Sequence, residues 1–330
     1  MQYRNLGRTG VKVSSLCFGT MSVGDIADEA MSEKMYHRCR EIGINFFDCA
    51  NVYADGRSEE LLGKFIAKER ENVVITSKVY FPTDKDVNAR GANRRHISLE
   101  AEKSLRRLNT DWIDIYFIHH FDEATPLEET LRALDDLVKQ GKILYPAASN
   151  FAAWQIMKAL GISYKEGLSR FEVIQPMYNL VKRQAEVEIL PMALSEGLGV
   201  IPYSPLGGGL LTGKYGPDKK PEKGRIVSNK MYSVRYGENW MFEAAEKFSN
   251  LALSMGVAPA SLAVRWVAEN PAVTAPIIGA RNLDQLEESL ASLTIDMTED
   301  LYLEISRITG KPAIATDRTE EIDRIMYKSK

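Results

Sequence analysis

Asp48, Tyr53 and Lys78 combine residue types and spacing that suit acid–base chemistry. Asp48 follows the apolar pair Phe46-Phe47, and Tyr53 comes five residues later. A carboxylate that enters a core is costly unless it is paired, and Lys78 at the end of the next apolar segment offers the cation. An ammonium held near Tyr53 would stabilise phenolate and lower the pKa of the phenol from its reference near ~10. That change would make Tyr53 a better general acid near neutral pH.

A histidine at the end of a further apolar segment completes the set. His119 or His120 would donate a hydrogen bond to the same substrate oxygen. Strand neighbours point to opposite faces, so one of the two faces the site, and the pattern leaves open which one. The set contains no obvious nucleophile and no metal ligands at a suitable spacing, so we expect no metal site. We expect proton delivery to a carbonyl oxygen while a cofactor hydride attacks the carbon.

Each of these residues also has an ordinary structural explanation. Asp48 could cap the next helix, Lys78 could be a solvated loop lysine, and Tyr53 could be an aromatic residue at a rim, since structural groups can also be perturbed. Their joint occurrence at successive strand ends favours the catalytic interpretation. Cys49 is expected to be a buried small residue without a lowered pKa.

The elements that must position these residues are eight short apolar segments that alternate with amphipathic helical patterns. Strands that are apolar on both faces, each followed by a helix, indicate a parallel sheet covered by helices. Eight such units, about 30 residues each, favour an α/β fold of the (β/α)8 TIM-barrel type over an open doubly wound sheet. The segments are SLCFGT, NFFDCA, NVVITSKV, WIDIYFIHH, KILYPAASN, FEVIQPMYN, GVIPYSPL and TAPIIGA.

We expect one domain over residues 1–330, with the barrel core at about 16–293. An N-terminal β-hairpin is predicted over residues 2–15, and extra helices are predicted near the C-terminus. The pattern breaks at a Gly/Lys-rich loop, 207–237, and a loop of this length inside a compact domain is usually functional or disordered. A polar tail follows from about Lys311, with a short helix predicted near 320–327.

Composition excludes several classes of protein. The 330 residues are 45% hydrophobic and 26% charged, with a formal net charge of -3, so nothing suggests a nucleic-acid partner. Three cysteines form no CxxC pair, which fits a reducing compartment. No apolar stretch is long enough to span a bilayer. We therefore expect a cytoplasmic protein with no membrane partner.

A barrel of this type places its active site where the strands end. The polar or glycine residues at the predicted strand ends are Gly19, Thr20, Asp48, Lys78, His119, His120, Ser149, Asn150, Gln175, Tyr203, Ser204, Gly279 and Arg281. The sequence has no GxGxxG dinucleotide motif. Glycines in LGGGLLTG (206–213) follow the seventh strand, where barrels commonly bind phosphate. With Lys214 and Arg281 nearby, they would suit a pyrophosphate and a 2′-phosphate.

The sequence resembles the aldo-keto reductase family from its opening YRNLGRTGVKVSSLCFGTM to about Leu293. The segments that carry the resemblance are FDCANVYADGRSEELLG, VVITSKV, DWIDIYFIHHFD, GKILYPAASNF, IQPMYNL, IPYSPLGGGLLTGKY and PIIGARNLDQLEES. The resemblance implies a (β/α)8 barrel that uses NADPH (NADP+) without a Rossmann motif. The glycine pattern and the hairpin look like the bacterial, potassium-channel-β-like branch, in which homo-oligomers occur.

The resemblance also implies roles for individual residues. The family's catalytic tetrad falls on Asp48, Tyr53, Lys78 and His119, because the histidine follows DIYFI directly. In that pattern Tyr53 is the general acid, Lys78 and Asp48 tune it, and His119 orients the carbonyl. Residues at the nicotinamide would be Gly19, Thr20, Met21, Asp48, Ser149, Asn150, Gln175 and Tyr203. Those toward the phosphates and adenine would be Ser204, Leu206, Gly208, Leu210, Lys214, Gly279, Arg281, Gln285, Glu288 and Ser289.

Three functions follow as hypotheses. The first is an NADPH-dependent oxidoreductase that reduces an aldehyde or ketone, with a small-molecule carbonyl or alcohol as its partner. The second is an NADPH-binding regulatory subunit with little turnover, as the channel-β likeness allows. A barrel aldolase with Lys78 as a Schiff base fits the lysine but not the cofactor loops. The sequence departs from the family at YPAASNF, at His120-Phe121 and at Ser289, where asparagine is frequent.

Overall fold

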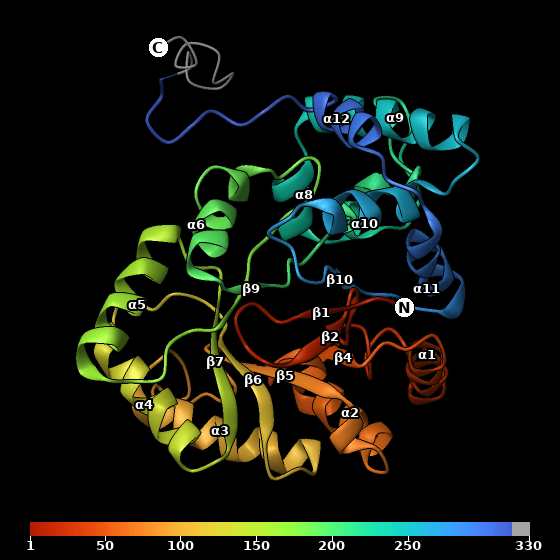
Figure 1. The fold of residues 1–330 in the computed structure, drawn as a ribbon. Helices are drawn as coiled ribbons and strands as arrows, with labels where there is room; N and C mark the ends of the chain where they lie inside the picture. Colours follow the sequence, from red (N-terminus) through yellow and green to blue (C-terminus); the bar gives the residue numbers. More distant parts are fainter. Residues whose placement is uncertain (319–330) are drawn as a thin grey trace.

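A computed structural model describes residues 1–318, and its centre is one eight-stranded parallel sheet (Figure 1). The strand order is β10-β3-β4-β5-β6-β7-β8-β9. Backbone N–H groups of Thr274 and Ala275 donate to the Val200 carbonyl, and that of Ile277 donates to Pro202. These bonds join the two outer strands, so the predicted (β/α)8 barrel is confirmed. The strands are β3 (Cys17–Gly19), β4 (Phe46–Asp48), β5 (Val74–Val79), β6 (Ile113–Ile118), β7 (Ile143–Ser149), β8 (Val173–Gln175), β9 (Gly199–Val200) and β10 (Ile277–Ile278).

Helices follow the strands and cover the outside of the sheet (Figure 1). They are α1 (Glu29–Glu41), α2 (Arg57–Ile66), α3 (Arg94–Leu108), α4 (Leu127–Lys139), α5 (Ala153–Glu166), α6 (Ile189–Glu196), α9 (Asn239–Ser254), α10 (Pro259–Glu269), α11 (Leu283–Leu290) and α12 (Glu299–Arg307). Each of α2 and α4 buries an apolar face, which includes Leu61 and Leu62 in α2 and Leu131 and Leu134 in α4. Helix α11 ends before Leu293. Leu293 lies in a 3-10 turn, η5 (Ala291–Thr294), and is 40% exposed.

The barrel strands alternate between two hydrophobic layers. Phe46 packs with the residues inside the barrel, whereas Phe47 packs with those between the sheet and the helices. The side chain of the next residue, Asp48, points into the barrel like that of Phe46, because side chains alternate along a strand. The apolar interior ends with Phe46 and Phe117 in their strands, and polar side chains follow at the next inward positions. This order places the functional groups at the C-terminal mouth.

The N-terminal hairpin closes the other end of the barrel. β1 (Tyr3–Asn5) and β2 (Lys12–Ser14) pair antiparallel, which confirms the predicted hairpin. Leu6 and Val13 are completely buried and join the barrel interior. The Arg8 N–H donates to the Gly197 carbonyl, just before β9. The interior is therefore sealed where the strands begin, and access is left at the ends that carry Asp48 and Lys78.

The segment 207–237, predicted as a loop, contains short helical turns. It includes η4 (Gly207–Thr212), α7 (Arg225–Ser228) and α8 (Lys230–Tyr236). Tyr232 and Tyr236 are buried, and a Cβ added to Gly208 would lie 2.7 Å from the Tyr232 ring. The α8 helix therefore lies against the glycine segment. Residues 311–318 form no helix or strand, and the helix predicted near 320–327 lies outside the described residues.

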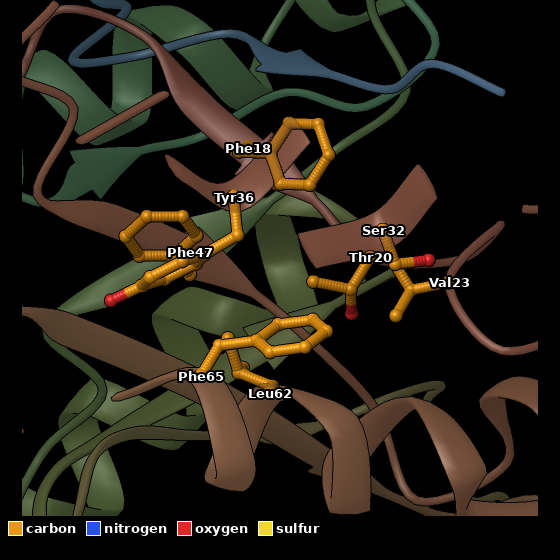
Figure 2. A pocket seen from close by; sticks show the side chains of 8 residues that line it. All are labelled: Phe18, Thr20, Val23, Ser32, Tyr36, Phe47, Leu62 and Phe65. Carbon is orange, nitrogen blue, oxygen red and sulfur yellow. The ribbon is translucent and has the colours of Figure 1, made fainter. Parts of the chain in front are cut away.

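Figure 2 shows a small void between the sheet and the helix layer. Its volume is about 10 Å³, close to the least that one water molecule needs. Its lining is mainly apolar and consists of Phe18, Thr20, Val23, Ser32, Tyr36, Phe47, Leu62 and Phe65. We interpret it as a packing defect rather than a ligand site.

No single helix within residues 1–318 is long and apolar enough to cross a membrane. Helices α9 and α10 are long and apolar enough only when taken together, and the chain bends by 101° between them.

Candidate active site

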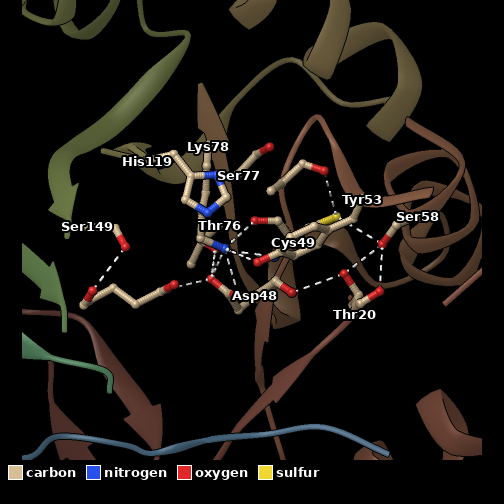
Figure 3. A network of polar contacts seen from close by, with 12 residues as sticks. Thr20, Asp48, Cys49, Tyr53, Ser58, Thr76, Ser77, Lys78, His119 and Ser149 are labelled. Carbon is tan, nitrogen blue, oxygen red and sulfur yellow. Dashed lines mark hydrogen bonds and ion pairs between the residues drawn. The ribbon is translucent and has the colours of Figure 1, made fainter. Parts of the chain in front are cut away.

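Asp48 and Lys78 form a buried ion pair at the barrel mouth (Figure 3). Lys78 Nζ donates to both oxygens of Asp48, at 2.8 and 2.7 Å, and to the Cys49 carbonyl at 2.7 Å. Thr76 and Gln175 donate to Asp48 Oδ1 at 2.7 and 2.8 Å. The pair is thus satisfied on both sides, as a buried pair must be. The pairing predicted from the two strand ends is confirmed.

Tyr53 lies directly beside this pair. Its hydroxyl oxygen is 3.3 Å from Lys78 Nζ, and the ammonium also lies 4.9 Å from the centre of the phenol ring. Burial raises the pKa of Tyr53 to about 12, and Lys78 opposes that rise. The expected lowering of this pKa is therefore wrong for the protein without ligands, because desolvation of the phenolate outweighs the attraction of the ammonium. The phenol stays protonated at neutral pH and remains a proton source.

The turn that carries Tyr53 has an unusual backbone. Ala54, Asp55 and Gly56 have φ values of 48°, 52° and 92°. Residues other than glycine disfavour these positive φ values. A Cβ at Gly56 would lie 2.8 Å from Cδ of Arg107. The Arg107 guanidinium is held in turn by the buried Glu59 carboxylate, at 2.6 Å. The Tyr53 turn is therefore packed against a fixed ionic group.

We expect Gly56→Ala to lower the free energy of unfolding by about 2–4 kcal/mol, the strain of a left-handed alanine plus a steric clash. Gly141→Ala is the matched control, because Gly141 also has a positive φ of 71° but nothing within 4 Å of the added Cβ. It should cost only about 1 kcal/mol. Urea titrations of both variants measure the difference. Equal losses would contradict the role of Arg107.

His119 lies next to Tyr53 and is held by its neighbours. The two rings meet edge to face with centroids 6.2 Å apart. Burial lowers the pKa of His119 well below its usual value, and the charge of Lys78 lowers it further. A neutral imidazole has one N–H to donate, and the buried Nδ1 has no hydrogen-bond partner within residues 1–318. His120 is exposed, with Nδ1 2.8 Å from the Phe121 carbonyl, so His119 is the one that faces the site.

A second polar network supports the loop between Asp48 and Tyr53. The Asn51 amide donates to the buried Glu100 carboxylate at 2.8 Å, and its backbone N–H donates to the Lys78 carbonyl. Thr83 donates to Glu100 at 3.0 Å. Helix α3 thus connects the Tyr53 loop to the loop that follows β5. Sequence reasoning missed this network, because Glu100 sits in an ordinary amphipathic helical pattern.

The residues predicted at the nicotinamide lie together on neighbouring strand ends. The Tyr203 hydroxyl donates to Asn150 Oδ1 at 2.7 Å, and the Asn150 amide donates to the Ser149 hydroxyl oxygen and the His119 carbonyl. The Ser149 hydroxyl donates to the Gln175 carbonyl, and Gln175 donates to Asp48. One chain of hydrogen bonds therefore connects Ser149, Asn150, Gln175 and Tyr203, predicted at the nicotinamide, to the ion pair.

On the far side of the ion pair, Thr20 donates to the Asp48 carbonyl at 3.0 Å. Ser58 donates to Thr20 (Figure 3). Gly19 is buried in β3, and Met21 is 41% exposed. Cys49 is buried, and burial raises the pKa of its thiol to about 12, as expected for an unreactive cysteine. Within the described part of the chain, no three His, Cys, Asp or Glu residues could hold a metal ion.

The backbone of the glycine segment after β9 would allow a ligand to approach it closely. Gly207, Gly208 and Gly209 have φ values of 57°, 67° and 101°, and Ser204 just before them has a φ of 59°. Leu206 precedes the turn, and Leu210 is buried within it. Only glycine adopts such a run at low cost, and absence of side chains lets a ligand lie against the backbone.

The cations predicted near the phosphates are present at this side of the barrel. Lys214 is exposed, and Arg281 is half-buried at the start of α11. The Arg281 N–H donates to Gln285 Oε1 at 3.2 Å. Gly279 and Glu288 are exposed nearby in the chain. Ser289 is buried and its hydroxyl donates to the Gln285 carbonyl, so the geometry lends no support to its predicted contact with adenine.

Arg225 is a further cation that sequence reasoning missed. Burial lowers the pKa of Arg281, and the charge of Arg225 lowers it further. Neither guanidinium forms an ion pair or a side-chain hydrogen bond with any residue in 1–318. Two neighbouring guanidinium groups without a carboxylate fit a dianion such as a phosphate monoester. Arg225 lies in the segment 207–237, whose lack of periodicity gave no signal beyond its basic composition.

A (β/α)8 barrel with Tyr53, Lys78, Asp48 and His119 at its mouth is the arrangement expected of an aldo-keto reductase. Comparison with known proteins identifies the same family. Residues 15–309 match the aldo/keto reductase family. The chain is 37% identical over 323 residues to YrpG of Bacillus subtilis, named an uncharacterized oxidoreductase, and the match covers 94% of this chain and 97% of that one. The chain belongs to the aldo/keto reductase family.

Two other relatives show the range of names within the family. A protein of Arabidopsis thaliana named a probable voltage-gated potassium channel subunit beta is 36% identical over 307 residues, which cover 89% of this chain and 92% of that one. The versiconal hemiacetal acetate reductase of Aspergillus parasiticus is 32% identical over 333 residues, covering 92% and 96%. The protein is thus an NAD(P)H-dependent aldo-keto reductase, and its family-level chemistry is carbonyl reduction.

Proposed function

We propose that the protein reduces an aldehyde or ketone with NADPH and that Tyr53 is the general acid. The observation that carries this proposal is the contact of the Tyr53 hydroxyl with the buried Lys78–Asp48 pair, at 3.3 Å. A phenol that stays protonated at neutral pH can deliver its proton to a developing alkoxide. The cofactor, when bound, supplies the hydride.

The other residues of the set prepare this proton transfer. Lys78 stabilises the phenolate left after transfer, because its ammonium is fixed by Asp48 and cannot turn away. Neutral His119 donates a hydrogen bond to the same carbonyl oxygen and orients it, through Nε2, because Nδ1 is buried. Ser149, Asn150 and Gln175 hold the carboxamide, and Tyr203 provides a flat face beside it.

Arg281, together with Arg225, would hold the 2′-phosphate of NADPH. We expect Arg281→Ala to weaken NADPH binding by roughly 10- to 100-fold, the range of charge-assisted hydrogen bonds. NADH binding should change little, because NADH lacks that phosphate. Fluorescence titration of each cofactor measures both values. Arg8→Ala is the control, since Arg8 is exposed at the closed end of the barrel.

Equal affinities for the two cofactors, both unaffected by Arg281→Ala, would contradict the assignment of the 2′-phosphate. Lys214, Ser204, Leu206, Gly208 and Leu210 would then still be candidates for the pyrophosphate. The cofactor preference and the position of the pyrophosphate are therefore tested separately.

The first experiment is a titration with NADPH and NADH, followed by reaction with a panel of carbonyl compounds. Loss of reduced-nicotinamide absorbance with an aldehyde or ketone would support the reductase. Tight NADPH binding without turnover would favour a second function, an NADPH-binding regulatory subunit. The similarity to channel β subunits of plants supports that alternative, whereas the intact Tyr53–Lys78 contact favours the enzyme.

A further inference from the structure

Arg235 has a guanidinium group without an ionic partner. It lies in the last turn of α8 and is half-buried. Its Cζ is 5.5 Å from the centre of the Tyr232 ring. Within residues 1–318 its side chain forms no hydrogen bond and no ion pair with a carboxylate. In this described part of the chain Arg225 and Arg281 also lack a carboxylate, whereas partly buried arginines elsewhere in the barrel are paired, such as Arg70 with Asp114 at 2.8 Å. An unpaired, partly desolvated guanidinium is costly, which suggests that an anion completes the site.

The surroundings of Arg235 place it at the catalytic end of the glycine segment. Tyr232 lies against Gly208, and both Arg225 and Arg235 approach its ring, at 5.7 and 5.5 Å. Arg225 interacts with Arg281, toward the predicted 2′-phosphate. Arg235 lies toward Tyr203, because the next residue, Tyr236, accepts a hydrogen bond from Asn179, which also donates to the carbonyl of Ser204. Burial raises the pKa of Tyr203 to about 12, and the charge of Arg235 opposes that rise.

Tyr203 is in turn connected by hydrogen bonds to His119, whose ring lies beside that of Tyr53 with centroids 6.2 Å apart. The Tyr203 hydroxyl donates to Asn150, which bonds to the His119 carbonyl. Arg235 is thus connected to the reacting end of the site through one aromatic residue. Arg225 and Arg235 therefore both lie beside the Tyr232 ring, and Arg235 belongs to the end of α8 that lies next to Ser204.

The pyrophosphate and the 2′-phosphate of NADPH already have candidate binding residues. Arg225 and Arg281 suit the 2′-phosphate, and the glycine backbone with Lys214 suits the pyrophosphate. Arg235, at the end of α8 next to Ser204, is left without such a role. We propose that Arg235 binds an anionic group of the carbonyl substrate, a carboxylate or a phosphate. This inference rests on the proposed reductase function and narrows its substrate class.

The rest of the mouth indicates the body of such a substrate. Phe81 is 38% exposed and meets the His119 ring edge to face, with centroids 4.9 Å apart. Tyr80 packs on Phe81 at 5.3 Å, and Met21 is exposed beside Thr20. Aromatic and thioether groups suit a flat or apolar body. The favoured substrate is an aldehyde or ketone with an aromatic or apolar body and an anionic substituent.

Paired substrates test the proposal. The protein is assayed with 4-formylbenzoate and its neutral methyl ester, and with glyceraldehyde 3-phosphate and glyceraldehyde. We expect wild type to prefer the anionic member of at least one pair, and the preferred pair identifies carboxylate or phosphate. Arg235→Met should lower kcat/KM for that anion by roughly 10- to 100-fold, mainly through KM. The neutral partner should change less than about threefold, and Arg235→Lys should recover part of the loss.

Two further measurements separate this role from others. NADPH affinity, measured by fluorescence titration, should stay the same in Arg235→Met. A loss of NADPH affinity with no change in the anion preference would assign Arg235 to the cofactor pyrophosphate and overturn the proposal. Equal losses for charged and neutral substrates would indicate a structural role and would also overturn it. Arg8→Met, at the closed end of the barrel, is the control for removing one positive charge.

A binding assay separates failure of this inference from failure of the reductase function. The unreactive dianion terephthalate is titrated into the NADPH-loaded protein by calorimetry, in wild type and in Arg235→Met. Weaker binding to the variant would support the anion site even if no carbonyl compound were reduced. If wild type reduces neutral carbonyls but neither terephthalate nor the anionic substrates depend on Arg235, the reductase function stands and the anion site is wrong.

Discussion

Tyr53→Phe is expected to lower kcat for carbonyl reduction by a factor on the order of 10² or more, the usual contribution of a positioned general acid. The phenylalanine ring keeps the shape of the residue, and the lost hydroxyl contacts Lys78 at 3.3 Å. The protein should therefore fold normally, and NADPH affinity should be nearly unchanged. Steady-state kinetics with one good carbonyl substrate and a fluorescence titration of NADPH measure the two quantities. Tyr164→Phe, on the exposed outer face of α5, is the control.

The pH dependence of the same reaction provides a second test of Tyr53. The protonated phenol is the donor, so activity is lost as pH rises through its pKa. Burial raises the pKa of Tyr53 to about 12 in the protein without ligands. Reduction should therefore show no loss assignable to Tyr53 between about pH 6 and 9, well below that pKa. Wild-type turnover in Tyr53→Phe would show that another group supplies the proton.

The sequence predicted the barrel and the position of the central ion pair for a simple physical reason. Phe46 and Asp48 point to the same side of their strand, and Lys78 points to the inside of the barrel from the neighbouring strand. An ion pair between Asp48 and Lys78 is therefore expected once the two strand ends lie side by side. Alternation along a strand is a local property and can be found without a structure. It left open which of His119 and His120 faces the site, and the structure decides this, because Ile115 and Phe117 point to the same side as His119 and lie inside the barrel.

The features that the sequence did not predict depend on packing between distant segments. The pKa of Tyr53 was expected to fall because Lys78 was near. The pKa rises instead, because all the segments around the barrel mouth together bury the phenol. Asn51 and Glu100 are 49 residues apart, and nothing in either local pattern indicates their contact. Arg225 and Arg235 come together only because α7 and α8 fold over the glycine segment.

Lys78→Met is expected to have the second large effect, on both stability and turnover. Lys78 is completely buried and provides three hydrogen bonds to Asp48 and the Cys49 carbonyl. Its removal leaves a buried carboxylate whose remaining donors within residues 1–318 are Thr76 and Gln175. Loss of one partner of a buried pair typically costs about 3–5 kcal/mol. Urea unfolding of wild type and variant measures this cost, and kcat should fall at least as far as in Tyr53→Phe.

The double variant Lys78→Met/Asp48→Asn separates the two roles of the pair. An amide in place of the carboxylate removes the uncompensated charge, so the double variant should recover much of the lost stability, because paired deletion costs less than breaking the pair. Turnover should stay low, because no ammonium remains to stabilise the Tyr53 phenolate. Recovery of both stability and turnover would show that Lys78 acts only as a structural counter-ion. Recovery of stability alone would establish that its charge is used in the chemistry at Tyr53.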